Sequence, residues 1–202
     1  MYKKKVLENG LRIMAVPMAG AKSITVMSLI EAGSKYENKK NNGISHFLEH
    51  MFFKGTQKRP RALDISHELD SLGAQSNAFT SQELTGYWAK AHPKHLDKIL
   101  DIISDMYLNP TFPAPDLERE KGVIIEEINM YEDLPQILVG EVLNELMYGD
   151  QPAGWSIAGR KENIKSFNRN DFINYRQNHY VASSTAIVIA GDIDEEDIFK
   201  KI

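Results

Sequence analysis

The sequence predicts an α+β fold in which a mostly antiparallel sheet packs against several helices. Three observations favour it. Short β-branched and apolar runs crowd the first part of the chain, helical apolar spacing dominates the middle, and one apolar run returns near the end. A parallel α/β fold would instead alternate strands and helices throughout. The 202 residues suffice for a substantial core, and we expect residues 1–202 to form one domain.

The first strands are predicted at the N-terminus. Residues 4–8 and 11–18 indicate a hairpin, because Asn9-Gly10 between two β-capable runs is a strong turn signal. Residues 23–30 form the next strand. The apolar run 186–190 is suited to a buried strand.

Two further strands are predicted at residues 74–79 and 84–91. The first mixes polar and apolar residues on both faces, with Ser76 and Ala78 alternating with Asn77 and Phe79. Such a strand fits poorly in the centre of a sheet and better at an edge, where its backbone groups remain available.

Proline, glycine and apolar spacing mark the helices. Residues 35–42 are expected to be a polar loop, with Asn41, Asn42 or Ser45 capping the helix that follows. Pro135 should interrupt the longest helix. The predicted helices lie at about 42–53, 61–72, 94–108, 116–133, 137–147 and 168–179, and another begins near 195.

Composition excludes several classes of protein. A net charge of -4 argues against a nucleic-acid binder, whose phosphate contacts need a basic face. With no cysteine, there is no disulfide frame, thiol nucleophile or cysteine zinc site, so a transition-metal site must use His, Asp or Glu. We see no signal peptide and no apolar run long enough to span a membrane, and we expect no membrane partner and a cytoplasmic protein.

The most informative stretch is His46-Phe47-Leu48-Glu49-His50. On a helix, positions i, i+3 and i+4 share a face, so His46, Glu49 and His50 project together. Two imidazoles one turn apart can bind one zinc ion, and a carboxylate beside them can take a proton from the metal-bound water. The alternative is a surface or half-buried helix that carries these residues by chance.

A third ligand must come from elsewhere, and residues 116–133 offer three candidates. Glu120 and Glu127 are two helical turns apart and share a face, whereas Glu126 is turned about 100° away. Spacing alone leaves the three open. The other histidines lie on polar segments and are expected at the surface; they are His67, His92, His95 and His179.

Taken together, the motifs resemble the pitrilysin/insulysin family of zinc metallopeptidases, in the branch of mitochondrial processing peptidase β subunits and bacterial processing proteases. His-x-x-Glu-His is the inverted zinc motif. The resemblance extends over nearly the whole chain and rests on Asn9-Gly10-Leu11, residues 31–37, residues 43–56, residues 77–81, residues 118–127 and Gly191-Asp192.

The resemblance implies a zinc endopeptidase that hydrolyses peptides or extended protein segments. It implies one Zn²⁺ per chain, held by His46, His50 and Glu127, with Glu49 activating the water. Glu120 matches an acidic residue that supports the site from outside the ligand set. Asn77, Ala78 and Phe79 match an edge strand to which an extended substrate adds by β-pairing.

The resemblance also implies a partner. Family members enclose the substrate in a clamshell, of which this chain matches the N-terminal half. We therefore expect a second half, supplied by a longer chain, a homologous subunit or a homo-oligomer. Two alternatives remain: a non-catalytic or partner-dependent binding or structural subunit of the same fold, and a metal-binding regulatory or storage module.

Overall fold

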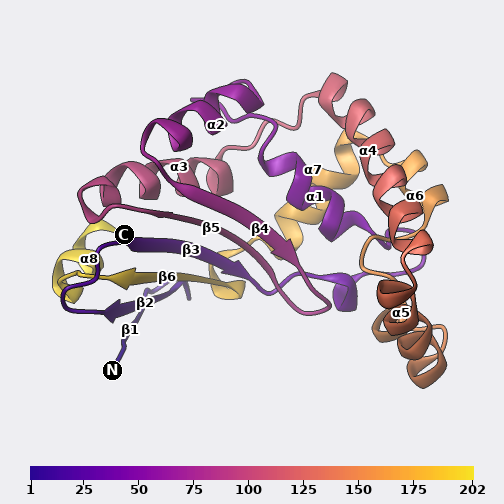
Figure 1. Cartoon of the computed structure of the whole chain (residues 1–202), viewed down its shortest axis with the longest axis horizontal. Helices are drawn as coiled ribbons and strands as arrows, with labels where there is room; N and C mark the ends of the chain where they lie inside the picture. The colour runs from indigo at the N-terminus through magenta and orange to yellow at the C-terminus, as the bar shows by residue number, and fades with distance from the viewer.

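Six strands form one sheet in the order β1-β2-β6-β3-β5-β4 in the computed structural model, which describes residues 1–202 (Figure 1). Neighbouring strands are antiparallel except for the parallel pair β2–β6. The predicted mostly antiparallel α+β fold is confirmed. The strands are β1 (Lys3–Val6), β2 (Arg12–Pro17), β3 (Ile24–Ile30), β4 (Gln75–Thr80), β5 (Thr85–Ala91) and β6 (Thr185–Gly191).

Most helices begin and end within a few residues of their predicted bounds. The exception is α6, which the sequence analysis missed because its six residues are too few to show a helical period. The break expected at Pro135 is present: α4 ends at Asp133, and α5 begins at Pro135. The helices are α1 (Ile44–Phe52), α2 (Ala62–Ser71), α3 (Leu96–Leu108), α4 (Ala114–Asp133), α5 (Pro135–Tyr148), α6 (Lys161–Ser166), α7 (Arg169–His179) and α8 (Glu195–Lys201).

Strand β4 lies at one edge of the sheet, as its mixed polarity predicted. It pairs only with β5, from Gln75↔Lys90 to Thr80↔Thr85. Its other side therefore carries backbone groups that no strand of this chain uses. Strand β6, by contrast, is less buried than expected. Ile189 is fully buried, but Ile187 and Val188 are only half-buried. The helices on the sheet pack mainly over other strands, α3 over β3 and β5 and α8 over β2, and so cover β6 less.

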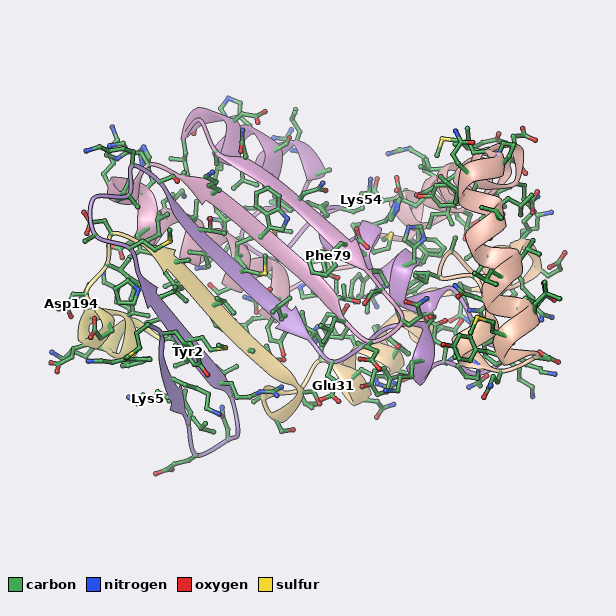
Figure 2. The ribbon with its side chains drawn as sticks, turned by 60° about the horizontal axis from the view of Figure 1, so that its bottom comes forward. Tyr2, Lys5, Glu31, Lys54, Phe79 and Asp194 are labelled. Carbon is green, nitrogen blue, oxygen red and sulfur yellow. The ribbon has the colours of Figure 1, made fainter.

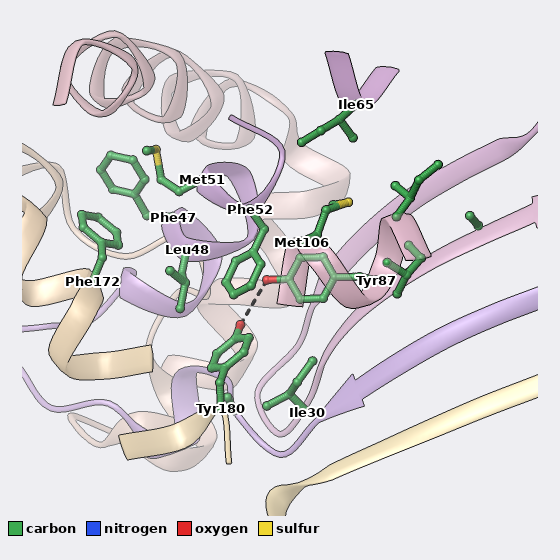
Figure 3. Close-up of a cluster of buried hydrophobic side chains, with 14 of the residues drawn as sticks. Ile30, Phe47, Leu48, Met51, Phe52, Ile65, Tyr87, Met106, Phe172 and Tyr180 are labelled. Carbon is green, nitrogen blue, oxygen red and sulfur yellow. Dashed lines mark hydrogen bonds between the residues drawn. The ribbon is translucent and has the colours of Figure 1, made fainter. Parts of the chain in front are cut away.

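Helix α1 is anchored by its apolar side (Figure 3). Phe47 meets Phe172 of α7 edge to face, with ring centroids 4.8 Å apart, and Phe52 stacks on Tyr180 at 5.1 Å. The hydroxyls of Tyr180 and Tyr87 are hydrogen-bonded at 3.1 Å. Because these aromatic contacts fix the helix from one side, the polar side is presented in one orientation.

The start of α1 differs from the prediction. None of the expected cap residues serves; Gly43 occupies that position with φ 99°, and the carboxylate of Glu37 accepts hydrogen bonds from the backbone N–H groups of Gly43 and Ser45. Glu37 is buried, so the expected polar loop at 35–42 is partly interior. A Cβ on Gly159 would lie 2.4 Å from the Cα of Gly43, so only glycines permit this contact.

Candidate functional site

Helices α1 and α4 bring His46, His50 and Glu127 together. One carboxylate oxygen of Glu127, Oε2, lies 3.6 Å from Nε2 of His46 and 3.5 Å from Nε2 of His50. One donor atom from each residue falls within 4.8 Å of the other two. The structure thus brings Glu127 to the histidines, while Glu126 is exposed and turned away toward Asn129.

The donor set fits a zinc ion. Ligands at 2.0–2.2 Å from a tetrahedral zinc would be roughly 3.3–3.5 Å apart, close to the separations from Glu127 to the two histidines. Burial, and then the neighbouring His50, lowers the pKa of His46 to about 4, so its imidazole is neutral at physiological pH and has a lone pair to offer. Nδ1 of His46 is buried without a hydrogen-bond partner.

A second carboxylate orients His50. Nδ1 of His50 lies 3.2 Å from Oε2 of Glu120, whose other oxygen is 2.8 Å from Nζ of Lys54. This leaves Nε2 of His50 directed at Glu127. Burial opposes the charged form of His50, but the interactions with Glu120 and Glu127 prevail and raise its pKa to about 9. The metal-free site therefore holds a proton that a metal ion would displace.

Tyr131 holds the carboxylate of Glu127. Its hydroxyl, one helical turn after Glu127, donates a hydrogen bond to Oε1, which leaves Oε2 facing the histidines. The contact with His50 lowers the pKa of Glu127 to about 2, against the effect of burial. Burial, together with Glu127, raises the pKa of Tyr131 to about 12, so it remains a hydrogen-bond donor.

Glu49 lies beside the cluster on the same side of α1. Thr80, at the end of β4, donates a hydrogen bond from its hydroxyl to Oε2 of Glu49. Burial raises the pKa of Glu49, although the Thr80 hydrogen bond and His50 act in the other direction. A carboxyl with a raised pKa is suited to exchanging protons with a water molecule and a leaving group.

A cleft of about 380 Å³ between α1, β4 and α5 is lined by His46, Glu49, His50, Glu127 and Tyr131. Ala78, Phe79 and Thr80 form its β4 wall, and Ile137 and Glu141 form its α5 wall. Figure 2 shows Phe79 on the sheet and Lys54 just after α1. Asn77 is exposed and does not line the cleft; its side-chain oxygen instead accepts a hydrogen bond from the N–H of Ala78 at 2.9 Å.

Sequence reasoning anticipated Glu120 but missed three other residues that hold functional groups: Tyr131, Thr80 and Glu37. Tyr131 follows Glu127 by four positions, a spacing that could have indicated the contact. Thr80 and Glu37 come from other elements and left no local signal. The four remaining histidines lie outside the cluster: His67 and His92 are exposed, and His95 and His179 are half-buried.

Comparison with known proteins agrees with the motif. The profile of the family described as Insulinase (Peptidase family M16) matches residues 13–161. The chain belongs to this family of peptidases. The resemblance seen in the sequence is thereby confirmed.

Two M16 relatives are similar along almost the whole chain. A Bacillus subtilis (strain 168) protein, "Uncharacterized zinc protease YmxG", is 39% identical over 98% of this chain and 48% of its own length. The "Mitochondrial-processing peptidase subunit beta" of Bos taurus is 42% identical over 96% of this chain and 39% of its own length. The chain thus spans half or less of these relatives.

Solved M16 structures share the fold. A protease from Helicobacter pylori superposes over all of this chain and 49% of its own, with a TM-score of 0.94 and 25% identity. A "peptidase M16 inactive domain" from Pseudomonas fluorescens does so over 49% of its chain, with a TM-score of 0.91 and 17% identity. The second case shows that the fold alone does not imply activity.

No helix in the structure combines the length and apolar character needed to cross a bilayer.

Proposed function

We propose that this M16 chain is the catalytic half of a zinc-dependent endopeptidase. The observation that carries the proposal is the convergence of three donor atoms, Nε2 of His46, Nε2 of His50 and Oε2 of Glu127, beside the carboxyl of Glu49. His46, His50 and Glu127 are the proposed ligands of one zinc ion. The zinc protease among the relatives supports this choice of metal.

The proposed chemistry is peptide-bond hydrolysis. A zinc ion at this position would acidify a water molecule and polarise the scissile carbonyl. Glu49 accepts the proton of the attacking water and passes it to the leaving amine, while Thr80 holds the carboxylate in place. Glu120 keeps the ring of His50 oriented through Nδ1.

The proposed substrate is an extended peptide or an unstructured protein segment. The open side of β4 borders the cleft, so a peptide that pairs with Ala78 and Phe79 would pass in front of Glu49. To pair there, it must displace the Asn77 side chain from the N–H of Ala78. Main-chain pairing would give affinity for many sequences.

A second half completes the enzyme in this proposal. The chain covers 48% of one relative and 39% of the other, and the second is a subunit by name. The competing function is a non-catalytic binding subunit, favoured by the inactive domain with the same fold. Against it stands the complete set of His46, Glu49, His50 and Glu127 in one cleft.

Two measurements test the proposal: metal content by mass spectrometry and cleavage of an unstructured peptide. The chain would be assayed alone and mixed with the half of the Bacillus subtilis protease that it does not match, produced as a separate polypeptide. We expect one zinc per chain and hydrolysis in the mixture.

Glu49→Gln should retain zinc and lose activity by a factor on the order of 10²–10⁴, because only proton transfer is removed. Glu126→Gln is the matched control. Its side chain is exposed next to Glu127 in the sequence, so the change should alter neither the zinc content nor the activity. Turnover by Glu49→Gln would rule out the role of Glu49. A zinc-loaded chain without turnover in any mixture would favour the binding subunit.

A further inference from the structure

A second hollow follows the cleft of the proposed zinc site along the same two elements. It has a volume of about 620 Å³ and lies between α5, the turn that joins β4 to β5, and the segment after α5. We call it the distal hollow. No residue lines both it and the cleft, so it is separate from the proposed zinc ligands. Its polar lining residues are Lys35, Gln82, Glu83, Asn144, Tyr148 and Gln151.

Helix α5 lines the cleft and the distal hollow with one face. Ile137 and Glu141 line the cleft. Asn144 and Tyr148 line the distal hollow. These four positions have the spacing i, i+4, i+7 and i+11, which places them in one row along a helix. The two hollows therefore follow one another along α5.

The walls opposite α5 are also consecutive in the chain. Ala78, Phe79 and Thr80 of β4 line the cleft. Gln82 and Glu83, in the turn after β4, line the distal hollow. Figure 1 shows this turn pointing toward the end of the molecule that carries α5. A peptide that leaves the cleft between β4 and α5 in this direction therefore enters the distal hollow.

The wall formed by the β4–β5 turn is held in place by residues 33–35. The N–H of Lys35 donates a hydrogen bond to the carbonyl of Gln82 at 2.8 Å. A Cβ on Gly33 would lie 2.3 Å from the carbonyl oxygen of Ser81, so only glycine permits this packing. Because the wall is already fixed, a ligand that binds against it loses little affinity to ordering the protein.

The chemistry of the distal hollow is uncharged hydrogen bonding. Its two charged groups neutralise each other, because Nζ of Lys35 lies 2.8 Å from a carboxylate oxygen of Glu83. The side chains of Gln82 and Asn144 have no hydrogen-bond partner in the chain, and neither does the hydroxyl of Tyr148. Each side-chain amide offers donors and an acceptor, which match the acceptor and donor that a peptide main chain presents.

We propose that the distal hollow is a substrate subsite, in which the amides of Gln82 and Asn144 bind the main chain of the peptide. The proposal rests on the proposed function, since it concerns the peptide that the cleft would cleave. From Glu141 to Tyr148 the helix rises about 10.5 Å, which an extended peptide covers in about three residues. Good substrates therefore extend about three residues beyond the part held in the cleft, and the sequence of that extension matters little.

Binding of fluorescent peptides to the Glu49→Gln chain, followed by anisotropy, tests the inference. The core probe is an unstructured peptide of about six residues, rich in serine and alanine, and two longer probes add serines for about four more residues at the N- or the C-terminus. We expect one longer probe to bind at least about fivefold more tightly than the core probe, the worth of one or two hydrogen bonds. With Gln82→Ala/Asn144→Ala added, the long and core probes should bind equally.

The matched control removes two amides elsewhere. Asn170→Ala/Gln177→Ala changes two exposed residues of α7 that line neither hollow, so it should keep the gain from the longer probe. Thermal unfolding should be the same for both double variants, because none of the four amides has a hydrogen-bond partner in the chain.

The charge of the extension distinguishes this subsite from an ionic one. Lysine or glutamate in place of the third added serine should change the affinity by less than about threefold, because Lys35 and Glu83 already neutralise each other. A larger gain with lysine would assign recognition to Glu83, and a larger gain with glutamate would assign it to Lys35; either result would overturn the inference.

The inference would also be wrong if neither longer probe binds more tightly than the core, or if Gln82→Ala/Asn144→Ala keeps the full gain. If no probe binds at all, the proposed substrate is wrong and the subsite falls with it. Intact length-dependent binding by a chain that never hydrolyses peptides would reject only the proposed catalysis.

Discussion

Two clusters of charged residues lie in this protein, and they are built in opposite ways. Around Arg59, the guanidinium meets three carboxylates, with Nη1 2.8 Å from Asp105 and Nε 2.9 Å from Glu68. Both oxygens of Asp105 are occupied, one by Thr56 and Arg59 and the other by Asn109. Each nitrogen of the Arg59 guanidinium thus has a carboxylate acceptor, and the cluster is closed.

The cluster of His46, His50 and Glu127 is open. Its outer atoms are held, Nδ1 of His50 by Glu120 and Oε1 of Glu127 by Tyr131, whereas one inner donor atom from each residue lies within 4.8 Å of the other two. Nδ1 of His46 is left unpaired. The comparison teaches that a closed cluster serves stability, while an open one keeps unmet bonding capacity for a ligand.

The largest expected effect is on zinc affinity, which should depend on the open cluster and not on the closed one. His46→Ala should weaken zinc binding by more than about 100-fold, because loss of a ligand exceeds the 10–100-fold cost of losing an outer contact. Its metal-free stability should change little, since the removed side chain has a buried unpaired nitrogen. Competition with a chromophoric chelator and urea unfolding measure the two quantities; unaltered zinc affinity would exclude His46 as a ligand.

The closed cluster should respond in the opposite way. Asp105→Asn should lower the free energy of unfolding at pH 7 by about 3 kcal/mol, because it leaves Arg59 short of a buried partner. That corresponds to a fall in Tm of roughly 6–12 °C. Zinc affinity should not change. Asp101→Asn, at a more exposed carboxylate, is the control and should cost less.

The effect of Asp105 should also depend on pH. Burial favours the neutral carboxyl, but hydrogen bonds from Thr56, Asn109 and Arg59 prevail and lower the pKa of Asp105 in the folded state. The stabilisation is therefore complete above the unfolded pKa of about 3.9 and is lost as the pH falls through the folded value. The difference in free energy of unfolding between the unaltered chain and Asp105→Asn should therefore narrow below about pH 4. A difference that stays constant with pH would contradict this account.

A smaller effect is expected from Tyr131, which holds the proposed metal ligand Glu127. Tyr131→Phe removes the hydrogen bond to Oε1 of Glu127 and should weaken zinc binding by about 10–100-fold. The absorption spectrum of the cobalt-substituted protein should shift with it. Tyr107→Phe, which loses a hydroxyl contact to Thr185 on the sheet, should change neither signal. Normal zinc affinity in Tyr131→Phe would mean that Glu127 needs no such support.

The smallest effect concerns the edge strand. Asn77→Ala frees the N–H of Ala78 and should strengthen binding of a peptide to the Glu49→Gln protein by about 2–10-fold, the worth of one hydrogen bond. Ser76→Ala on the same strand is the control. Weaker binding by Asn77→Ala would show instead that the amide itself contacts the peptide.

Local patterns explain how much was predictable. The helix of His46 and His50, and the edge position of β4, follow from spacing and polarity within a few residues. The choice of a third ligand among Glu120, Glu126 and Glu127 does not follow from such patterns. Periodicity indicates which residues share a face of the helix, but not which face meets α1. The family resemblance pointed to Glu127, and the structure places it at the histidines.

Contacts that local capping and periodicity patterns do not cover account for the errors. The cap of α1 was sought in Asn41, Asn42 and Ser45, but the buried carboxylate of Glu37 occupies it. Thr80 reaches Glu49 only because β4 ends beside α1. The contact of Thr80 is created by the tertiary fold, so no window of sequence around the motif contains it. Glu37 precedes its backbone partners by six and eight residues, which is farther than a local capping pattern extends.

The contact between Gly43 and Gly159 has a consequence for the order of assembly. Because the backbone at Gly159 lies directly against Gly43, the cap residue just before α1, that helix reaches its final place only when distant parts of the chain have met. Contacts of such sequence separation form late and slowly in folding. If the proposed zinc site is correct, the metal is acquired after folding, and a ribosome-bound chain that has released α1 and α4 but not residue 159 should still lack the cluster of His46, His50 and Glu127.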